Sequence, residues 1–248
     1  MRIAGIIAEY NPFHLGHAYQ IEKTRELGVT HVVCVMSGNF VQRGEPAVFQ
    51  KAARVRAALS AGADLVIELP LPWAMAPAQT FARGGVALLD ALGCVDVLSF
   101  GSECGDLPLL RASARALGCE GFSLLLKEKL AGGLPFAQAR AQAMAAFAPS
   151  LAAPLDTPND TLALEYLAAL SSLSSPIEPV CITRKGAGHD AVKPQDGFVS
   201  ASFLRQRIAE GRFDEAAAFL PPKAVSIFRE ELEARRAPAG LKELQRAV

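Results

Sequence analysis

The sequence has no excess of charge of either sign, because 25 lysines and arginines balance 25 aspartates and glutamates. A chain with this balance has no overall field that would attract nucleic acid or an acidic membrane surface. A nucleic-acid site would therefore have to be a local basic patch. Disorder is not expected either. Of the 248 residues 51% are hydrophobic, which is too many for a disordered chain.

Long apolar runs and cysteine patterns are also missing. No stretch reaches the ~18 apolar residues that a membrane-spanning helix needs, and the first residues contain no signal-peptide pattern. The 5 cysteines form no CxxC pair, so neither a metal site nor a disulfide framework is expected. We interpret them as small buried hydrophobic residues. The sequence thus predicts a soluble cytoplasmic protein without membrane contact, and it leaves the oligomeric state open.

What the sequence does contain is a regular alternation of strand and helix patterns. Short apolar runs typical of buried parallel strands alternate with helical patterns along the first part of the chain. The strands are expected at 3–8, 31–36, 64–69 and 95–100, and the helices at 17–27, 49–61 and 78–92. This alternation favours an α/β fold with a parallel sheet, right-handed crossovers and helices on both faces.

After Gly105 the pattern becomes mostly helical. Helices are expected at 107–117, 123–130, 136–147, 159–170, 200–210 and 213–236, with one more short strand at 179–183. We therefore expect a main domain over residues 1–210, with a helical insertion at about 107–175, and a helical C-terminal segment over 211–248. The boundary is placed near residue 210 because the sheet-forming sequence ends there.

The most informative segment is N-P-F-H-L-G-H at residues 11–17, which follows the first expected strand and opens the first helix. Ligands of open parallel sheets bind at the carboxyl ends of the strands, and a helix N-terminus there attracts phosphate. Gly16 lets the backbone approach a ligand closely. His14 and His17 can donate hydrogen bonds to phosphate oxygens as negative charge develops on them. The segment therefore predicts a nucleotide-phosphate site.

The two other histidines have weaker claims to a role. His31 begins an expected strand and is interpreted as a structural residue. His189 lies in a polar loop after Arg184 and Lys185, from which it could approach a ligand.

With its histidine loop the sequence resembles the HxGH nucleotidyltransferase superfamily, in which ATP is attacked at its α-phosphate. That superfamily has a downstream element rich in Ser and Thr that ends in Arg at a helix start, and the stretch S-A-S-F-L-R at residues 200–205 fits it. Hydroxyl and N–H groups at such a helix start can hold the β- and γ-phosphates, while Arg205 supplies a fixed fork of donors. Here Ser202-Phe203-Leu204 stands in place of the more usual Thr-Ala-Ile, which keeps a hydroxyl.

Five longer stretches are similar to the bacterial tRNA(Met) cytidine acetate ligase family. They are GIIAEYNPFHLGH at 5–17, MSGNFVQRGEP at 36–46, GADLVIELP at 62–70, SFGSECGD at 99–106 and TPNDTLALEY at 157–166. Members of this family activate acetate with ATP, release pyrophosphate, and place the acetyl group on N4 of the wobble cytidine of elongator tRNA(Met).

This resemblance implies an ATP-dependent, AMP-forming ligase with ATP, acetate and tRNA(Met) as its partners and Mg²⁺ bound through the ATP phosphates. It implies a Rossmann-like parallel sheet of the HxGH type with a helical C-terminal appendage. Residues 1–210 would then be the catalytic domain. Residues 211–248 would begin a second helical region, because chains of the family normally continue well past this point.

The resemblance also implies the site residues. The catalytic residues would be His14, His17 and Arg205. The ATP site would consist of Ile7, Ala8, Glu9, Tyr10, Asn11, Pro12, Phe13, His14, Leu15, Gly16, His17, Ala18, Tyr19, Gln20, Gly101, Asn159, Arg184, Lys185, Ser200 and Ser202. The loop after the second strand lies on the same rim of the sheet, so acetate, pyrophosphate or tRNA could bind to Asn39, Gln42, Arg43, Lys51 and Arg54. Lys51 and Arg54 could instead belong to a solvated helix face.

Three other functions remain open at this point. A small-molecule nucleotidyltransferase of coenzyme A or NAD biosynthesis would share the HxGH loop and the downstream arginine, but not the long stretches at 36–46 and 99–106. A class I aminoacyl-tRNA synthetase is less favoured, because residues 200–205 contain no lysine of the KMSKS type. An inactive RNA-binding or scaffold protein is disfavoured by the intact histidines and arginine.

Overall fold

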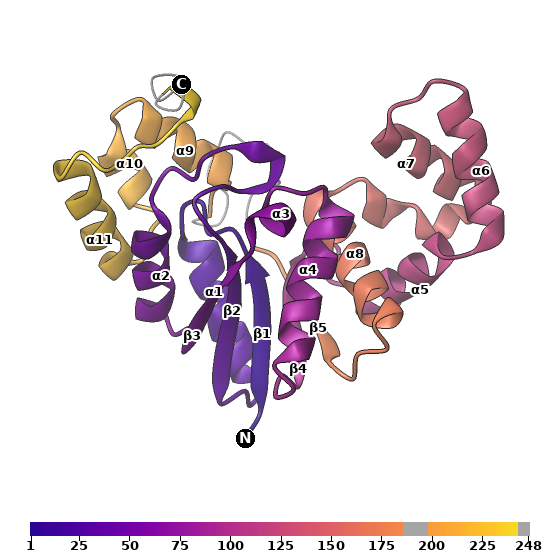
Figure 1. The fold of residues 1–248 in the computed structure, drawn as a ribbon, viewed down its shortest axis with the longest axis horizontal. Coiled ribbons are helices and arrows are strands. Elements are labelled where there is room, and N and C mark those ends of the chain that lie inside the picture. Colours follow the sequence, from indigo (N-terminus) through magenta and orange to yellow (C-terminus); the bar gives the residue numbers. More distant parts are fainter. Residues whose placement is uncertain (186–197, 243–248) are drawn as a thin grey trace.

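Five parallel strands form the centre of the molecule, in the order β3-β2-β1-β4-β5 (Figure 1). The computed structural model describes residues 1–185 and 198–242. Its strands are β1 (Ile3–Ala8), β2 (His31–Ser37), β3 (Leu65–Leu69), β4 (Val97–Ser102) and β5 (Glu178–Thr183). The predicted α/β fold with a parallel sheet is confirmed.

Both faces of the sheet are covered, which is why its strands are apolar along their whole length. Successive residues of a strand point to opposite faces. Ala4 and Ile6 of β1 lie in one hydrophobic core, and Ile3 and Ile7 lie in the other. Gly5 allows close approach on the second face, because a Cβ atom there would lie 2.5 Å from Leu89 Cδ1.

The helices divide between the two faces of the sheet. The first core contains residues of α1 (Leu15–Glu26), α2 (Lys51–Ser60), α9 (Ala201–Ala209), α10 (Phe213–Ala217) and α11 (Pro222–Glu233). The second core contains residues of α4 (Ala78–Ala91), α5 (Leu107–Leu117) and α8 (Pro158–Ser172). A short helix, α3 (Leu71–Ala74), precedes α4 and was not predicted. The predicted helices on both faces are therefore confirmed.

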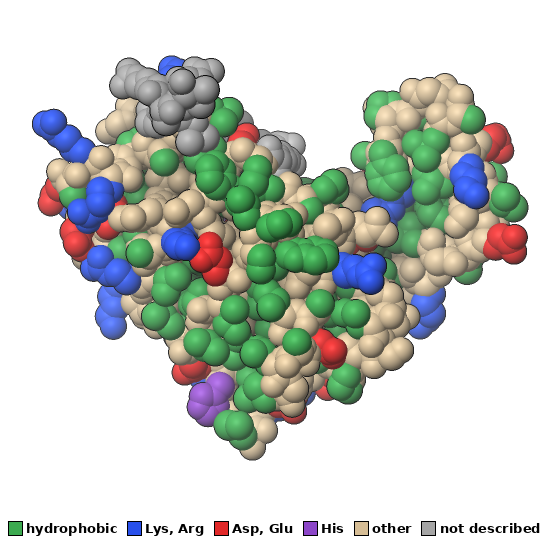
Figure 2. Space-filling model, in the orientation of Figure 1, with side chains coloured by type: hydrophobic (Ala, Val, Ile, Leu, Met, Phe, Trp, Pro, Cys, Tyr) green, Lys and Arg blue, Asp and Glu red, His purple; other side chains and the backbone are tan. Residues whose placement is uncertain are grey.

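Two helices stand to the side of the sheet, α6 (Glu120–Ala131) and α7 (Phe136–Phe147) (Figure 1). They have a small core of their own, which includes Phe122 and Met144. A buried ion pair of 2.5 Å between Arg140 Nη1 and Glu165 Oε1 connects α7 to α8. Figure 2 shows the surface hollowed between this pair of helices and the rest of the molecule.

The C-terminal helices pack on α2 and on the start of α1. The rings of Phe49 and Phe228 stack with their centroids 4.2 Å apart, and Leu15 N donates to Phe219 O at 2.9 Å. The expected helical segment over 213–236 is confirmed, and it is divided into α10 and α11, with Pro221 and Pro222 at the division. Proline has no N–H to continue a helix and is favoured at a helix start. The division of the chain at residue 210 stays a prediction.

The cysteines were expected to be small buried hydrophobic residues, and only one of the five is fully buried. Cys34 is buried, Cys181 is half-buried, and Cys94, Cys104 and Cys119 are exposed. Three of the five expected buried cysteines are therefore at the surface. None of the helices in the described part of the chain combines the length and the apolar character needed to cross a membrane.

Candidate nucleotide-binding site

The first helix begins at the carboxyl end of the central strand β1, and His14 is its N-cap residue. Nδ1 of His14 accepts a hydrogen bond from Gly16 N at 3.0 Å. Nδ1 of His17 accepts one from His14 N at 3.2 Å. The two imidazoles thus satisfy backbone donors of the first turn reciprocally, in the arrangement known as a capping box.

These hydrogen bonds determine where each imidazole carries its proton. A neutral imidazole has one donor and one acceptor nitrogen, so Nδ1 as acceptor leaves the proton on Nε2. The rings of His14 and His17 stack with centroids 3.8 Å apart and an interplanar angle of 24°. Both imidazoles therefore carry an Nε2–H donor at the helix N-terminus.

The histidines are also held in the neutral form. Burial, together with the positive charges of Arg184 and Arg205, lowers the pKa of His14 to about 3. Burial likewise lowers the pKa of His17 well below its ordinary value, with His14 and Arg184 adding to the effect. Because protonation of either ring is disfavoured, both act as uncharged donors near neutral pH.

A cleft of about 470 Å³, its open mouth included, lies beside these rings. Its lining consists of His14, Gly16, His17, Tyr19, Gln20, Gly101, Ile182, Thr183, Arg184, Lys185, Phe198 and Val199. Lys185 Nζ lies 5.0 Å from the centroid of the Tyr19 ring, and that ring meets Phe198 edge-on at 5.9 Å. The cleft therefore offers positive charge, hydrogen-bond donors and aromatic surface, which together fit an anionic ligand with a planar group.

The structure separates the predicted ATP-site residues into two groups. His14, Gly16, His17, Tyr19, Gln20, Gly101, Arg184 and Lys185 all line the cleft. The other residues predicted between positions 7 and 18 lie elsewhere. The side chains of Ile7, Tyr10, Pro12 and Phe13 are buried, and Ala8 and Ala18 pack against the first core. The four buried side chains are not available to a ligand, which could meet these residues only through their backbone.

Two polar residues of the loop between β1 and α1 hold neighbouring loops. Asn11 Oδ1 accepts from Val48 N at 2.8 Å, and Glu9 Oε1 accepts from Gln42 N at 2.9 Å. Their side chains thus connect this loop to the chain between β2 and α2. The polar side chains of the histidine loop therefore divide between shaping the loop and lining the cleft.

The predicted Ser-Arg element lies next to the histidine loop. Ser200 is the N-cap of α9, and its Oγ accepts from Phe203 N at 3.2 Å. Ser200 Oγ and Ser202 Oγ are 2.9 Å apart. Arg205 Nη1 donates to Asn11 O at 3.0 Å, which connects α9 to the loop that follows β1. Two segments far apart in the sequence are thereby brought together as predicted.

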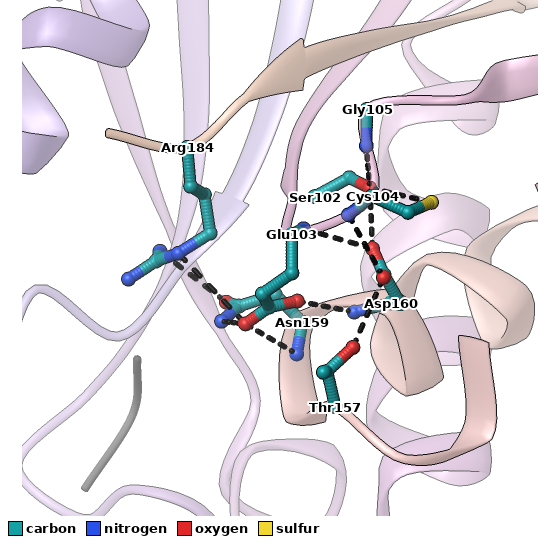
Figure 3. Close-up of polar contacts among 8 residues, drawn as sticks. All are labelled: Ser102, Glu103, Cys104, Gly105, Thr157, Asn159, Asp160 and Arg184. Carbon is teal, nitrogen blue, oxygen red and sulfur yellow. Dashed lines mark hydrogen bonds and ion pairs between the residues drawn. The ribbon is translucent and has the colours of Figure 1, made fainter. Parts of the chain in front are cut away.

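The turn after β4 and the start of α8 hold each other by reciprocal hydrogen bonds (Figure 3). Asp160 Oδ1 accepts from Ser102 Oγ and, at 2.9 Å, from Glu103 N, and Asp160 Oδ2 accepts from Cys104 N at 3.0 Å. In return, Glu103 Oε2 accepts from Asp160 N at 2.9 Å, and Glu103 Oε1 accepts from Asn159 Nδ2. We call this arrangement the β4–α8 clasp.

Sequence reasoning missed the two carboxylates of the clasp. Asp160 is only 2% exposed, and Glu103 lies within ion-pair distance of Arg184, with 3.9 Å between Glu103 Oε1 and Arg184 Nε. The sequence did contain a signal for Asp160, because Thr157 and Asp160 have the spacing of a capping box at a helix start. Thr157 Oγ1 does donate to Asp160 Oδ2 at 3.0 Å, but the carboxylate also accepts from the turn after β4.

Arg54 differs from the expectation that it belongs to a binding rim. Its side chain is fully buried at 0% exposure. Arg54 Nε donates to Phe49 O at 3.0 Å, Nη1 donates to Ser37 O at 3.1 Å and to Glu9 O, and Nη2 donates to Gly38 O. Every nitrogen of the guanidinium thus binds a backbone carbonyl, so Arg54 joins the loops after β1 and β2 and presents no donor to a ligand.

The other residues predicted around the second strand have local partners. Asn39 Oδ1 accepts from Lys51 N at 2.8 Å and so caps the start of α2. Lys51 Nζ forms a half-exposed ion pair with Glu68 Oε2 at 2.6 Å. Gln42 and Arg43 lie in a 3₁₀ turn, and the side chain of Arg43 is outside what the structure describes. None of the described side chains of this loop lines the cleft beside the histidines.

The two remaining histidines lie away from the cleft or outside the description. His31 is exposed at the amino-terminal end of β2, where its Nδ1 is 3.0 Å from Thr30 Oγ1. His31 therefore lies at the opposite end of the strands from the cleft, which agrees with its interpretation as a structural residue. His189 lies outside the described residues.

Comparison with known proteins identifies similar sequences along the whole chain. Residues 1–248 match the model of the HIGH nucleotidyl transferase family. The tRNA(Met) cytidine acetate ligase of Acetivibrio thermocellus is 44% identical over 96% of this chain and 60% of its own length. The tRNA(Met) cytidine acetate ligase of Halothermothrix orenii is 39% identical over 100% of this chain and 62% of its own length. The chain therefore spans less than two thirds of the length of these curated relatives.

Solved structures agree with these sequence matches. The apo crystal structure of Thermotoga maritima TmcAL superposes with a TM-score of 0.90 at 37% identity, over 97% of this chain and 59% of that one. The same protein bound with alpha-thio ATP gives a TM-score of 0.88 over 97% and 58%. The resemblance predicted from the five sequence stretches is confirmed.

Proposed function

Because this chain belongs to the HIGH nucleotidyl transferase family, we propose that it activates acetate with ATP and passes the acetyl group to tRNA(Met). The product would be acetylated at N4 of the wobble cytidine, with AMP and pyrophosphate released. The names of the relatives support this substrate set, and the neighbour bound with alpha-thio ATP supports a nucleotide in this fold. The reaction would take place in the cytoplasm, where ATP and tRNA are available.

The observation that carries the proposal is the stacked pair of neutral histidines at the start of α1. Their Nδ1 atoms are occupied by backbone donors, so both Nε2–H groups are free to donate outward. Donors fixed in this way need no reorganisation when charge develops on a phosphoryl group. The helix N-terminus adds a partial positive charge at the same place.

In the first step, a carboxylate oxygen of acetate forms a bond to the α-phosphorus of ATP. The bond from that phosphorus to the oxygen bridging the β-phosphate breaks, and pyrophosphate leaves with the electron pair. Acetate is already ionised at neutral pH, so this step needs no general base. We propose that His14 and His17 donate to the α-phosphoryl oxygens, while Arg205 and the start of α9 with Ser200 and Ser202 hold the leaving pyrophosphate.

The polar lining of the cleft does not fit a dedicated Mg²⁺ site. Mg²⁺ prefers oxygen ligands, whereas the cleft presents imidazole, guanidinium and ammonium groups from His14, His17, Arg184 and Lys185. No group of three or more His, Cys, Asp or Glu side chains suited to a metal occurs within 1–185 and 198–242. We propose that Mg²⁺ reaches the site on the phosphates of ATP.

In the second step, the exocyclic amine of cytidine attacks the acetyl carbonyl carbon, AMP leaves, and the amine loses a proton. Acetyl-adenylate, the mixed anhydride formed in the first step, is already activated, so the orientation of the two reactants supplies most of what the transfer requires. We propose that residues 1–210 form the catalytic domain for the first step. Residues 211–248 would begin a second region.

Acetate-dependent exchange of labelled pyrophosphate into ATP tests the first step. We expect exchange by the intact chain and a loss of about a hundredfold or more in the variant His17→Ala, because one fixed donor is removed. The matched control is His31→Ala, since His31 is exposed at the opposite end of the strands and should leave exchange unchanged. Thermal melting confirms that the variants are folded. Undiminished exchange by His17→Ala would contradict the mechanism.

Two further measurements separate the proposal from the alternatives. Exchange that depends on phosphopantetheine or a nicotinamide nucleotide, and not on acetate, would assign the chain to the small-molecule nucleotidyltransferases. No exchange with any acid, together with retained tRNA binding, would indicate an inactive RNA-binding protein. Incubation with ATP, acetate and tRNA(Met), with acetylcytidine as the readout, tests the second step.

A further inference from the structure

The carboxylate of Glu103 contacts two residues that the nucleotide site is expected to use. Glu103 Oε1 accepts from Asn159 Nδ2 and lies 3.9 Å from Arg184 Nε (Figure 3). Its other oxygen, Oε2, accepts from Asp160 N at 2.9 Å at the start of α8. One side chain from the turn after β4 therefore contacts residues from α8 and from the end of β5.

These contacts fix the orientation of the Asn159 amide. An ionised carboxylate can only accept hydrogen bonds, so the amide must turn its Nδ2 toward Glu103. Asn159 Oδ1 then faces Arg184, whose Nη1 donates to it at 3.5 Å. If the charge at position 103 were lost, either orientation of the amide would be acceptable. The acceptor-only character of Glu103 thus decides which atom Asn159 presents.

The same contacts hold the Arg184 guanidinium at the rim of the cleft. Arg184 N is fixed to β4 by its hydrogen bond to Ser102 O at 2.9 Å, and the side chain then crosses the end of that strand. Gly101 leaves room for it, because a Cβ atom there would lie 3.3 Å from Arg184 Cγ. Among the described residues that line the cleft, Arg184 is present, and neither Glu103 nor Asn159 is. Any influence of Glu103 on a ligand in the cleft would therefore pass through Arg184, which both Glu103 and Asn159 contact.

We propose that Glu103 is a positioning residue for nucleotide binding, which holds Arg184, directly and through the Asn159 amide, in the orientation that receives ATP. This inference rests on the proposed function, because it assumes that ATP occupies the cleft beside the histidines. Glu103 orders these side chains before the ligand arrives, so the nucleotide does not have to order them itself.

The test compares two variants that each remove one interaction from the β4–α8 clasp. Glu103→Gln removes the charge that faces Asn159 and Arg184. Thr157→Val removes only the hydrogen bond to Asp160 Oδ2, and Thr157 is not among the residues that line the cleft. Equilibrium titration with ATP should give a Kd about tenfold higher for Glu103→Gln, the size expected for one charge-assisted hydrogen bond. Thr157→Val should keep the Kd of the unmodified chain, although thermal melting should show that both variants are destabilised.

A double-mutant cycle shows whether Glu103 acts through Arg184. Adding Glu103→Gln to Arg184→Gln should cost little further ATP affinity, because the residue to be positioned is already gone. Equal Kd values for the unmodified chain and Glu103→Gln would overturn the inference and leave the proposed function standing. Fully additive losses in the cycle would also overturn it. Failure of the unmodified chain to bind ATP would overturn the proposed function, and this inference with it.

A second substitution keeps the test decisive if Glu103→Gln melts below the assay temperature. Glu103→Asp retains the charge but is one methylene shorter, so it cannot contact Asn159 Nδ2 and Asp160 N as Glu103 does. It should also bind ATP more weakly than the unmodified chain. An unchanged Kd in this variant would contradict the positioning role.

Discussion

Replacing His14 by asparagine should remove a specific sensitivity of the fold to acid. Asn is a good N-cap residue, so its Oδ1 can accept from Gly16 N as His14 Nδ1 does, while the titratable ring is lost. The folded chain holds His14 neutral, because burial lowers its pKa from 6.5 to about 3. The unfolded chain has no such restriction. Between these two pH values the unfolded chain therefore binds a proton that the folded chain does not.

The size of the effect follows from proton linkage. The contribution of His14 to stability is fully present above pH 6.5 and is lost as the pH falls toward 3. At pH 5.0 the loss amounts to about 2 kcal/mol, because the unfolded ring is almost fully protonated and the folded ring is not. At 6% exposure the ring is too buried for solvent screening to reduce this value substantially. The other titrating groups contribute to both proteins and cancel to first order in the comparison.

Urea denaturation followed by circular dichroism at pH 7.5 and pH 5.0 measures this difference. The unmodified chain should lose about 2 kcal/mol more of its unfolding free energy over this range than His14→Asn does. If the two proteins lose the same free energy to within about 0.5 kcal/mol, His14 is not held neutral. The assignment of an uncharged Nε2–H donor to His14 would then be wrong as well.

The remaining predictions concern two arginines with different roles. Arg54→Lys should lower the free energy of unfolding by about 3 kcal/mol, because one ammonium group cannot replace the planar fork that binds the carbonyls of Glu9, Ser37 and Gly38. Urea denaturation measures this loss, and a stability equal to the unmodified chain would refute the buried role. Arg205→Lys should lower acetate-dependent pyrophosphate exchange by about tenfold or more, because Lys keeps the charge but not the fork. Exchange at the unmodified rate would remove Arg205 from the proposed mechanism.

Local sequence patterns predicted most of the elements of the fold. The bounds of β1, α5 and α7 agree with those expected at 3–8, 107–117 and 136–147. Their apolar periodicity is complete within each segment, so no distant information is needed. The short helix α3 was missed because four residues contain too little periodicity. The break between α10 and α11 is marked by Pro221 and Pro222, but the helical pattern on both sides of them makes the bounds of the two helices hard to predict.

Prediction of the candidate site succeeded where its residues are close together in the sequence. His14, Gly16 and His17 form a compact motif, and all three line the cleft. The clasp was not predictable, because Glu103 and Asp160 meet partners 56 to 58 positions away. Their sequence stretches were recognised as similar to a family, but neither residue type indicates a partner by itself.

Arg54 shows most clearly what the sequence leaves undecided. An arginine in an amphipathic helix normally points to solvent, and nothing in K-A-A-R-V-R at residues 51–56 distinguishes Arg54 from the exposed Arg56. The carbonyl groups that it binds come from the loop after β1, from the end of β2 and the glycine that follows it, and from Phe49 shortly before α2, which only the folded chain brings together.

The sequence by itself determined the parallel α/β sheet, the histidine loop and the downstream Ser-Arg element, because each is encoded in a short contiguous pattern. The tertiary structure alone decided which charged residues reach the cleft and which are used to build it. The reason is physical, since the role of a charged side chain depends on whether water, a backbone carbonyl or another charge lies next to it in space. Arg184 and Lys185 reach the cleft, whereas Arg54 and Asp160 are satisfied within the protein.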